Sequence, residues 1–350
     1  MIRTLPRGAA VQAVLDDAVA HGLTPGAVAS IVRPDGSSER FTSGHKHDAD
    51  DDPVNASTIY DLASLTKLLC TTALVAKAVD EDVIALDEQP FARWPGVTVA
   101  HLLQHTSGLC AHRPLHELAI KAGATAQSAG RVVVVEAALQ TIPEAAPGKR
   151  TLYSDLGFIA LGSLLEERHG KPLDELFTSA APTGLRFVNL WREGYHPAVL
   201  QTAPTERCAW RRRAVHGQVH DENAFAMGGV AGHAGLFGSL VDVEGAALSL
   251  MRAIKSETTL RMFARAPGER GLGFDKATRG GSTGDALGPA TVGHLGFTGT
   301  SIWIDPDYDD DGAAFVLLAN TLFPTREGVL ARNKELRRAF HRAAALGEVG

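Results

Sequence analysis

The sequence has little cysteine, no long apolar run and no excess of positive charge. Its three cysteines, Cys70, Cys110 and Cys208, are odd in number and far apart, so no disulfide framework is expected. The longest valine run, residues 132–135, ends at Glu136 and is far too short to span a bilayer. With 34 Lys and Arg against 40 Asp and Glu, the net charge of −6 gives no electrostatic reason to bind nucleic acid or an anionic membrane.

The first 22 residues also lack the apolar core of a secretory signal peptide. They show helical spacing instead, with Ala10, Val14 and Ala18 on one face. Together with the cysteine content, this predicts a reduced, cytoplasmic protein. Removal of a leader would instead imply a periplasmic or secreted one.

The remaining composition is that of an ordinary globular protein, with 350 residues, 45% hydrophobic and 21% charged. Patterning predicts a helix over 9–21, a hairpin over 26–44 around Pro34-Asp35-Gly36, and, near the end, strands 301–306 and 314–320 followed by a helix over 327–346. From about 58 to 180 the pattern is mostly helical, and it includes a short helix ending at Gly108 and an amphipathic helix closed by Gly170.

This order predicts an α/β fold of the α+β sandwich kind. An antiparallel sheet is built from the N- and C-terminal segments and flanked by helices, with a mostly helical inserted lobe. The expected organisation is one catalytic unit over 1–350, in which 1–60 and 229–350 form the α/β lobe and 61–228 the helical lobe.

The segment "DLASLTKLLCTTALVAKAV", residues 61–79, has the composition of a buried helix but carries Ser64 and Lys67 in its first turn. Residues three apart lie on one helical face, so the hydroxyl and the amine are within reach of each other. Lysine removes the hydroxyl proton only when its pKa falls from ~10.4, and burial supplies part of that fall. The pair is therefore either a nucleophile with its base or a capping serine with a solvent-seeking lysine.

The neighbouring motifs decide between these alternatives, because S-x-x-K by itself is common. A second copy, "SGHK" at 43–46, lies in a predicted polar loop with no helix behind it. "YSD" at 153–155 starts a helix, and "HLG" at 294–296 heads a strand. Tyr153 supplies a second acid/base group, and the strand supplies an edge and a second oxyanion N–H. A further Y-x-D match at 308–310 falls in a hairpin turn.

In order and spacing, these three motifs resemble the serine β-lactamase and penicillin-binding protein superfamily, in the class C-like branch with esterases and D-amino-peptidases. The blocks "HLLQHTSGL", "PGKRTLYSDLGFIALGSLLEE" and "GGVAGHAGLFGSLVDV" extend the similarity over residues 24–330. The resemblance implies that Ser64 is the acylated nucleophile, Lys67 its partner base and Tyr153 the proton shuttle. It also implies an oxyanion hole made by the backbone N–H groups of Ser64 and Phe297, and a substrate-binding strand at His294 and Gly296.

Two positions depart from the family pattern. Asp155 stands where Asn is usual, and an ionised carboxylate only accepts hydrogen bonds. Asp155 is expected to contact substrate or to hold Lys67 charged, which would move the role of base towards Tyr153. His294 replaces the strand lysine, so the charge there is conditional near neutrality. Both changes favour an esterase, amidase or peptidase over a true β-lactamase.

Residues 202–237 resemble relatives that act in cell-wall recycling, including N-acetylmuramyl-L-alanine amidases. That resemblance implies a muropeptide amide as substrate, with His220, Asp221 and Glu222 shaping the pocket and Arg211–Arg213 meeting carboxylates. A loop of solvated charges is the alternative.

The sequence thus predicts a serine hydrolase that acts through an acyl-enzyme on a cell-wall-derived amide or on an ester, with a small molecule or peptidoglycan fragment as substrate and with no cofactor or metal. A carboxylesterase or a true β-lactamase on the same site is an alternative, and so is an acylated sensor that never turns over. Two other enzyme classes are weighed and disfavoured. The pairs His101/His105, His112/His116 and His216/His220 have metal-ligand spacing but lack the H-E-x-x-H glutamate. "GGSTG" at 280–284 lacks the flanking strand and helix of a nucleophile elbow.

Overall fold

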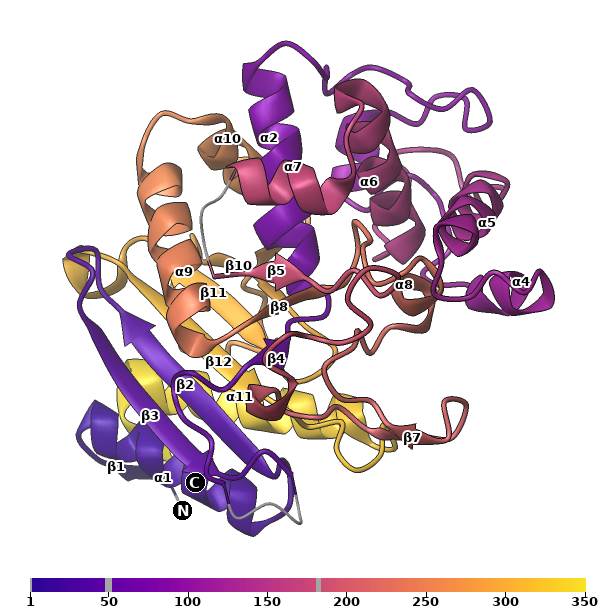
Figure 1. Ribbon diagram of the computed structural model, residues 1–350. Coiled ribbons are helices and arrows are strands. Elements are labelled where there is room, and N and C mark those ends of the chain that lie inside the picture. Colours follow the sequence, from indigo (N-terminus) through magenta and orange to yellow (C-terminus); the bar gives the residue numbers. More distant parts are fainter. Residues whose placement is uncertain (1, 48–51, 181–183) are drawn as a thin grey trace.

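The computed structural model describes residues 2–47, 52–180 and 184–350, and its centre is a six-stranded antiparallel sheet (Figure 1). The strand order is β3 (Ser38–Gly44), β2 (Gly26–Val32), β12 (Ala313–Ala319), β11 (Ser301–Asp305), β10 (Val292–Leu295) and β9 (Asp275–Lys276). Val28 of β2 lies opposite Leu318 of β12, so the first hairpin joins the last strands directly. The prediction of an antiparallel sheet built from both ends of the chain is confirmed.

Strands β2 and β12 are apolar throughout because both faces of the sheet are covered. One face packs Ile31 and Phe315 against α1 (Arg7–Ala20) and α11 (Val329–Leu346). The alternate residues of the same strands join a second core, on the face covered by α9 (Leu240–Lys255). Figure 1 shows α9 on one side of the sheet and α11 with α1 on the other. This arrangement is the predicted sandwich.

Helices dominate the chain between the two halves of the sheet. They are η1 (Lys67–Thr72), α2 (Ala73–Asp80), α3 (Val99–Leu103), α4 (His116–Lys121), α5 (Ser128–Leu139), α6 (Asp155–His169), α7 (Leu173–Ala180), α8 (Glu222–Ala226) and, after α9, α10 (Thr259–Arg265). The helix expected to close at Gly170 is α6, and Gly170 ends it in the left-handed conformation with φ 64°. The boundaries proposed for the two lobes stay a prediction.

Short strands connect the central sheet with the helical region. β4 (Tyr60–Asp61), β8 (Leu236–Gly238) and β5 (Arg186–Phe187) form one small sheet, and β6 (Arg207–Cys208) with β7 (Arg213–Ala214) forms a hairpin. β1 (Arg3–Thr4) pairs with β13 (Glu348–Val349), which brings the two ends of the chain together (Figure 1). Single-turn 3₁₀ helices occur at η2 (Val199–Gln201) and η3 (Tyr308–Asp310). Within the described residues, every helix is too short or too polar to cross a bilayer.

Two local predictions were wrong. The helix expected to reach Gly108 ends at Leu103, because His105 takes a left-handed φ of 59° and the chain turns away. The second S-x-x-K lies partly in a strand instead of a loop. Ser43 belongs to β3, and its hydroxyl donates to Asp16 at 2.7 Å. The Y-x-D match at 308–310 falls in the β11–β12 connection, as predicted.

Candidate active site

Ser64 lies in the turn between β4 and the first buried helix. The preceding residue, Ala63, has a left-handed φ of 47°, which is costly for a residue with a side chain and is held here by its neighbours. Its N–H donates to Asp61 Oδ1 at 2.8 Å, and its carbonyl accepts from Thr66 Oγ1 at 2.7 Å. The helix then opens as a six-residue π-helix at Lys67, a form often found at functional sites. Ser64 is thus presented by a strained turn that its neighbours brace.

Lys67 is fully buried beneath this turn. Its Nζ donates to Ser64 Oγ at 2.9 Å and to the carbonyl of His233 at 3.0 Å, and it forms an ion pair with Asp155 Oδ1 at 2.8 Å. The Nζ lies 4.9 Å from the ring centroid of Tyr153, which lines the same cavity as Ser64. The structure therefore brings together Ser64, Lys67 and Tyr153, as the sequence motifs predict.

The buried charges settle which form Lys67 takes. Burial alone would lower the pKa of Lys67, but the Asp155 carboxylate and the Tyr153 hydroxyl hold it above the ordinary lysine value. Burial would raise the pKa of Asp155, and Lys67 together with His112 brings it well below its usual range. The pKa of Tyr153 is raised by burial, against the opposing effect of Lys67. The geometry supports a charged Lys67, whose charge favours the phenolate form in which Tyr153 could accept a proton.

Two residues of the cavity lining have a backbone N–H without an acceptor among the described residues. Within the described residues, neither Ser64 N–H nor Phe297 N–H donates to a protein atom, and both residues line the cavity. Thr298 Oγ1 donates to the carbonyl of Asp61 at 2.8 Å and Thr300 Oγ1 to that of Leu62 at 3.2 Å. These bonds fasten the Phe297 turn to the chain that carries Ser64, which is the arrangement an oxyanion hole needs.

The turn after β10 is also held from α11. Arg337 Nη2 donates to the carbonyl of Gly296 at 2.5 Å, and Asn333 Nδ2 donates to that of Phe297 at 2.9 Å. A Cβ on Gly296 would lie 2.6 Å from the carbonyl oxygen of Leu62, so only glycine fits there. Gly296 N–H donates to Thr300. Both backbone polar groups of Gly296 thus have partners and the residue is closely packed beside the site, while its predicted contact with substrate stays a prediction.

His294 lines the cavity as a neutral ring. Burial lowers its pKa to about 4. Its Nδ1 lies 2.9 Å from the carbonyl of Leu295, which can only accept, so Nδ1 carries the proton. Nε2 is then a bare acceptor, with no partner among the described residues. The conditional charge expected at this position is absent near neutrality.

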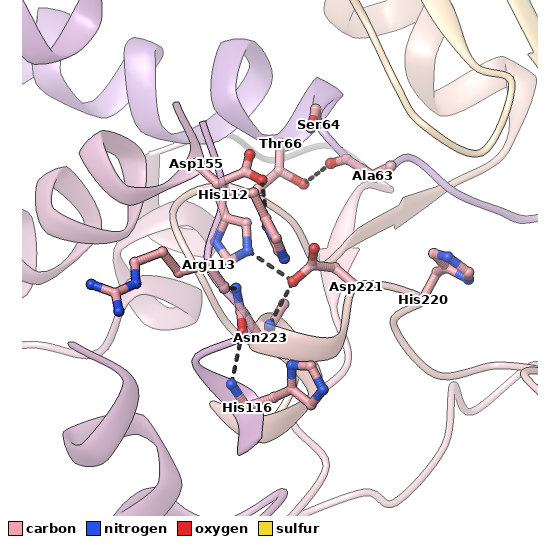
Figure 2. Close-up of polar contacts among 12 residues, drawn as sticks. Ala63, Ser64, Thr66, His112, Arg113, His116, Asp155, His220, Asp221 and Asn223 are labelled. Atoms are coloured by element: carbon pink, nitrogen blue, oxygen red, sulfur yellow. Dashed lines mark hydrogen bonds and ion pairs between the residues drawn. The ribbon is translucent and has the colours of Figure 1, made fainter. Parts of the chain in front are cut away.

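His220 and Asp221 also line the cavity, and Figure 2 shows them on one stretch of chain. Burial lowers the pKa of His220 to about 4, and its ring lies 5.9 Å from that of Phe297. Asp221 caps α8 by accepting from Ala224 N at 2.7 Å, and it accepts from His233 Nε2 at 2.8 Å. Both reach the cavity, but each already has a structural partner.

The cavity has a volume of about 540 Å³ and is rich in paired charges. Its arginines are Arg270, which pairs with Asp275, Arg326, which pairs with Glu222, and Arg337. Sequence analysis missed all three, because arginines on a loop and on an amphipathic helix give the pattern of a solvated face.

The arginines that sequence analysis did single out lie outside the cavity lining. Arg211 donates to the carbonyls of Val219 and His220 and lies over the Phe225 ring, so it ties the β6–β7 hairpin to the segment that leads into α8. Arg213 hydrogen-bonds to Gln218. The prediction that Arg211–Arg213 meet substrate carboxylates finds no support in this placement.

The histidine pairs with metal-ligand spacing have other partners in the structure. His101 Nδ1 accepts from Thr98 N at 3.1 Å at the start of α3, while His105 lies beyond the end of that helix. In the part of the chain that the structure describes, no three His, Cys, Asp or Glu side chains gather closely enough to hold a metal ion. The "GGSTG" segment is a loop tied to α11 through Arg338.

The chain is similar to known proteins over most of its length. A family model described as Beta-lactamase matches residues 11–339. A protein of Escherichia coli O157:H7 named "Putative D-alanyl-D-alanine carboxypeptidase" is 32% identical over 313 residues, which cover 77% of this chain and 70% of that protein. A protein of the same name from strain K12 is 31% identical over 300 residues, 73% of this chain and 68% of that one.

Solved structures show the same fold at lower identity. EstCE1, a hydrolase with promiscuous acyltransferase activity, has a TM-score of 0.70 at 23% identity, with 96% of this chain and 98% of that chain covered. Unliganded simvastatin synthase from Aspergillus terreus has a TM-score of 0.70 at 20% identity, with 97% and 98% covered. These likenesses concern the fold.

Proposed function

The chain belongs to the beta-lactamase family and is a serine hydrolase, and from that premise we propose that it cleaves the terminal amide of a peptidoglycan-derived peptide through an acyl-enzyme on Ser64. The observation that carries the proposal is the 2.9 Å contact between Lys67 Nζ and Ser64 Oγ at the floor of the cavity. The free N–H groups of Ser64 and Phe297 support it.

In the proposed reaction, Tyr153 acts as its phenolate and takes the proton of Ser64 Oγ as that oxygen attacks the substrate carbonyl, so that Tyr153 becomes a neutral phenol. Lys67 stays an ammonium, paired with Asp155, and lowers the cost of negative charge on Tyr153 and on the developing oxyanion. The N–H groups of Ser64 and Phe297 hold that oxyanion. Tyr153 then gives its proton to the leaving amine. A water molecule, activated by Tyr153 in turn, hydrolyses the ester and restores Ser64.

The choice of a peptidoglycan fragment rests on the family and on the cavity. The relatives with about 30% identity carry the name of a D-alanyl-D-alanine carboxypeptidase. The product of such a cleavage and its substrate both end in a carboxylate. Arg337 lines the cavity with hydrogen bonds to carbonyl oxygens, and within the described residues it has no carboxylate partner. An anionic end group therefore has a complement in this site.

An ester is the second candidate, because the cavity has an apolar rim. Phe297 is 39% exposed and Leu330 is 73% exposed, and both line the cavity. Exposed apolar side chains at a cavity mouth suit an acyl chain or an apolar alcohol. The neutral His294 adds no positive charge to that part of the site.

The test is intact-protein mass spectrometry after treatment with a fluorophosphonate and, separately, with a penicillin. The wild type should gain one phosphonyl group, and Ser64→Ala should gain none. Ser43→Ala is the matched control, since Ser43 belongs to the other S-x-x-K copy and is expected to label like the wild type. The assignment of Ser64 as the nucleophile would be refuted if the wild type took up no phosphonate, or if the Ser64→Ala variant still did.

The substrate class is tested by turnover. Release of D-alanine from a diacyl-lysyl-D-alanyl-D-alanine peptide over many cycles supports the carboxypeptidase proposal. Release of p-nitrophenol from short-chain esters, without D-alanine release, favours the esterase. A single stoichiometric burst with either substrate indicates an acylated sensor instead of an enzyme that turns over.

A further inference from the structure

The carboxylate of Asp155 is shared between a lysine and a histidine. Its Oδ1 lies 2.8 Å from Lys67 Nζ, and its Oδ2 lies 3.3 Å from Nδ1 of His112. Figure 2 shows the His112 ring beside Asp155, on the side of the site that faces Asp221. Lys67 is fully buried, whereas the His112 side chain is 46% exposed and lines the cavity. A continuous chain of contacts thus runs from Ser64 through Lys67 and Asp155 to a titratable group in contact with solvent.

We propose that His112 is a positioning residue of this active site, whose imidazolium shares the Asp155 carboxylate with Lys67 and so adjusts the charge felt by Ser64 and Tyr153. The inference rests on the proposed function, because it concerns the reactivity of the same serine. Asp155 is the link. A carboxylate accepts at both oxygens, whereas an asparagine at this position would offer only one acceptor.

The surroundings of His112 favour its charged form. The hydrogen bond with Asp155 raises the pKa of His112 above its ordinary value, while burial opposes that change and the carboxylates of Asp221 and Glu222 add to it. The charged or titratable groups that interact with His112 or Asp155 are Lys67 of η1, Tyr153 ahead of α6, Asp221 and Glu222 at the start of α8, and His233 ahead of β8. Arg113 is directed away and bonds to Thr141 at 3.5 Å (Figure 2).

Protonation of His112 changes the net charge beside the nucleophile. With His112 charged, Lys67, Asp155 and His112 sum to one positive charge, and with His112 neutral they sum to zero. The extra positive charge favours proton loss from Tyr153 and stabilises the oxyanion. A shift of one pKa unit in the base is a tenfold change in its ionised fraction. Since solvent screens the half-exposed His112, we expect a three- to tenfold effect on reactivity.

The test is the rate constant for phosphonylation of Ser64 between pH 5 and pH 9 in the wild type and in His112→Gln. Glutamine keeps an N–H donor for Asp155 Oδ2 but does not titrate. The wild type should react three- to tenfold faster than His112→Gln near pH 5.5, and the ratio should fall to about one by pH 9. His21→Gln is the matched control, because His21 lies 3.1 Å from Asp17 in an exposed pair at the end of α1. It should match the wild type at every pH.

The outcomes separate this inference from the proposed function. Equal rates for wild type and His112→Gln at every pH would refute the coupling, and a constant loss at every pH would show a structural role only. If Ser64 is never phosphonylated, the proposed function fails. The inference about His112 is then tested by a proton NMR titration of its ring signal, which is assigned by the absence of that signal in His112→Gln. A midpoint above 6.5 supports the shared carboxylate, and one at or below 6.5 overturns it.

Discussion

Replacing Asp155 by Asn should convert the buried Lys67 from a stabilised ammonium into an uncompensated one. At 2.8 Å and an effective dielectric constant of about 20, the attraction between the two groups is about 6 kcal/mol before desolvation. Removal of one partner from a buried ion pair costs roughly 3–5 kcal/mol, because the other charge stays buried. We expect Asp155→Asn to lower the free energy of unfolding by that amount at pH 7.

The pH dependence of this loss of stability tests whether Lys67 is a buried cation. In the wild type, Asp155 has a depressed pKa, so its contribution is present above pH ~4 and is lost on acidification. Lys67 has a raised pKa, so its contribution is present below pH ~10.4 and is lost above that. Asp155→Asn removes the group that does most to raise the pKa of Lys67, so burial should lower this pKa below that of the unfolded chain. The variant should therefore regain stability as the pH rises from 7 towards 10.

The assay is urea denaturation of wild type and Asp155→Asn at pH 7 and pH 9.5, followed by circular dichroism. Asp309→Asn is the matched control, since Asp309 pairs with Arg7 at 2.7 Å on the exposed surface, where a pair contributes about 0–1 kcal/mol. A deficit for Asp155→Asn that is below about 1 kcal/mol at pH 7, or that is as large at pH 9.5 as at pH 7, would refute the assignment of Lys67 as a buried cation.

Two further predictions concern packing and acid stability. Gly296→Ala should lower the rate of Ser64 phosphonylation by at least tenfold, because its Cβ would lie 2.6 Å from the carbonyl oxygen of Leu62. Gly245→Ala is the control and should leave that rate unchanged, because its Cβ would meet no atom within 4 Å. Equal rates for both variants would contradict the close fit at Gly296. Burial lowers the pKa of His341 to about 4, so the free energy of unfolding should fall by up to about 3 kcal/mol as the pH falls from 6.5 to 4. His341→Leu should remove that part of the pH dependence in urea denaturation curves. An unchanged pH dependence in this variant would show that His341 is not a buried, neutral histidine.

Elements with local signals could be predicted from the sequence. The Pro34-Asp35-Gly36 turn and the alternation around it indicate the β2–β3 hairpin, and Gly170 marks the end of α6. The end of α3 could not be predicted in this way. His105 leaves the helix there and stacks on Tyr153 and Phe158, at ring distances of 4.5 and 5.1 Å, and these contacts form only in the folded protein.

The same distinction holds for the site. Ser64, Lys67 and Tyr153 could be singled out because each belongs to a short motif with a recognisable helix or strand beside it. His112 was noticed only as half of a histidine pair, and Asn333 and Arg337 not at all. Their partners, Asp155 and the 296–300 turn, are distant in sequence. A hydrogen bond across such a separation leaves no periodic pattern in either segment.

The sequence alone therefore determined the chemical groups and their order along the chain: a serine and a lysine one turn apart, a tyrosine at a helix start and a glycine after a strand. The tertiary structure decided their protonation states. Whether Lys67 is an ammonium depends on Asp155 lying 2.8 Å away in a buried place, and whether His294 is charged depends on its burial. Electrostatic energy depends on distance and on the surrounding dielectric, and the packing of remote segments sets both.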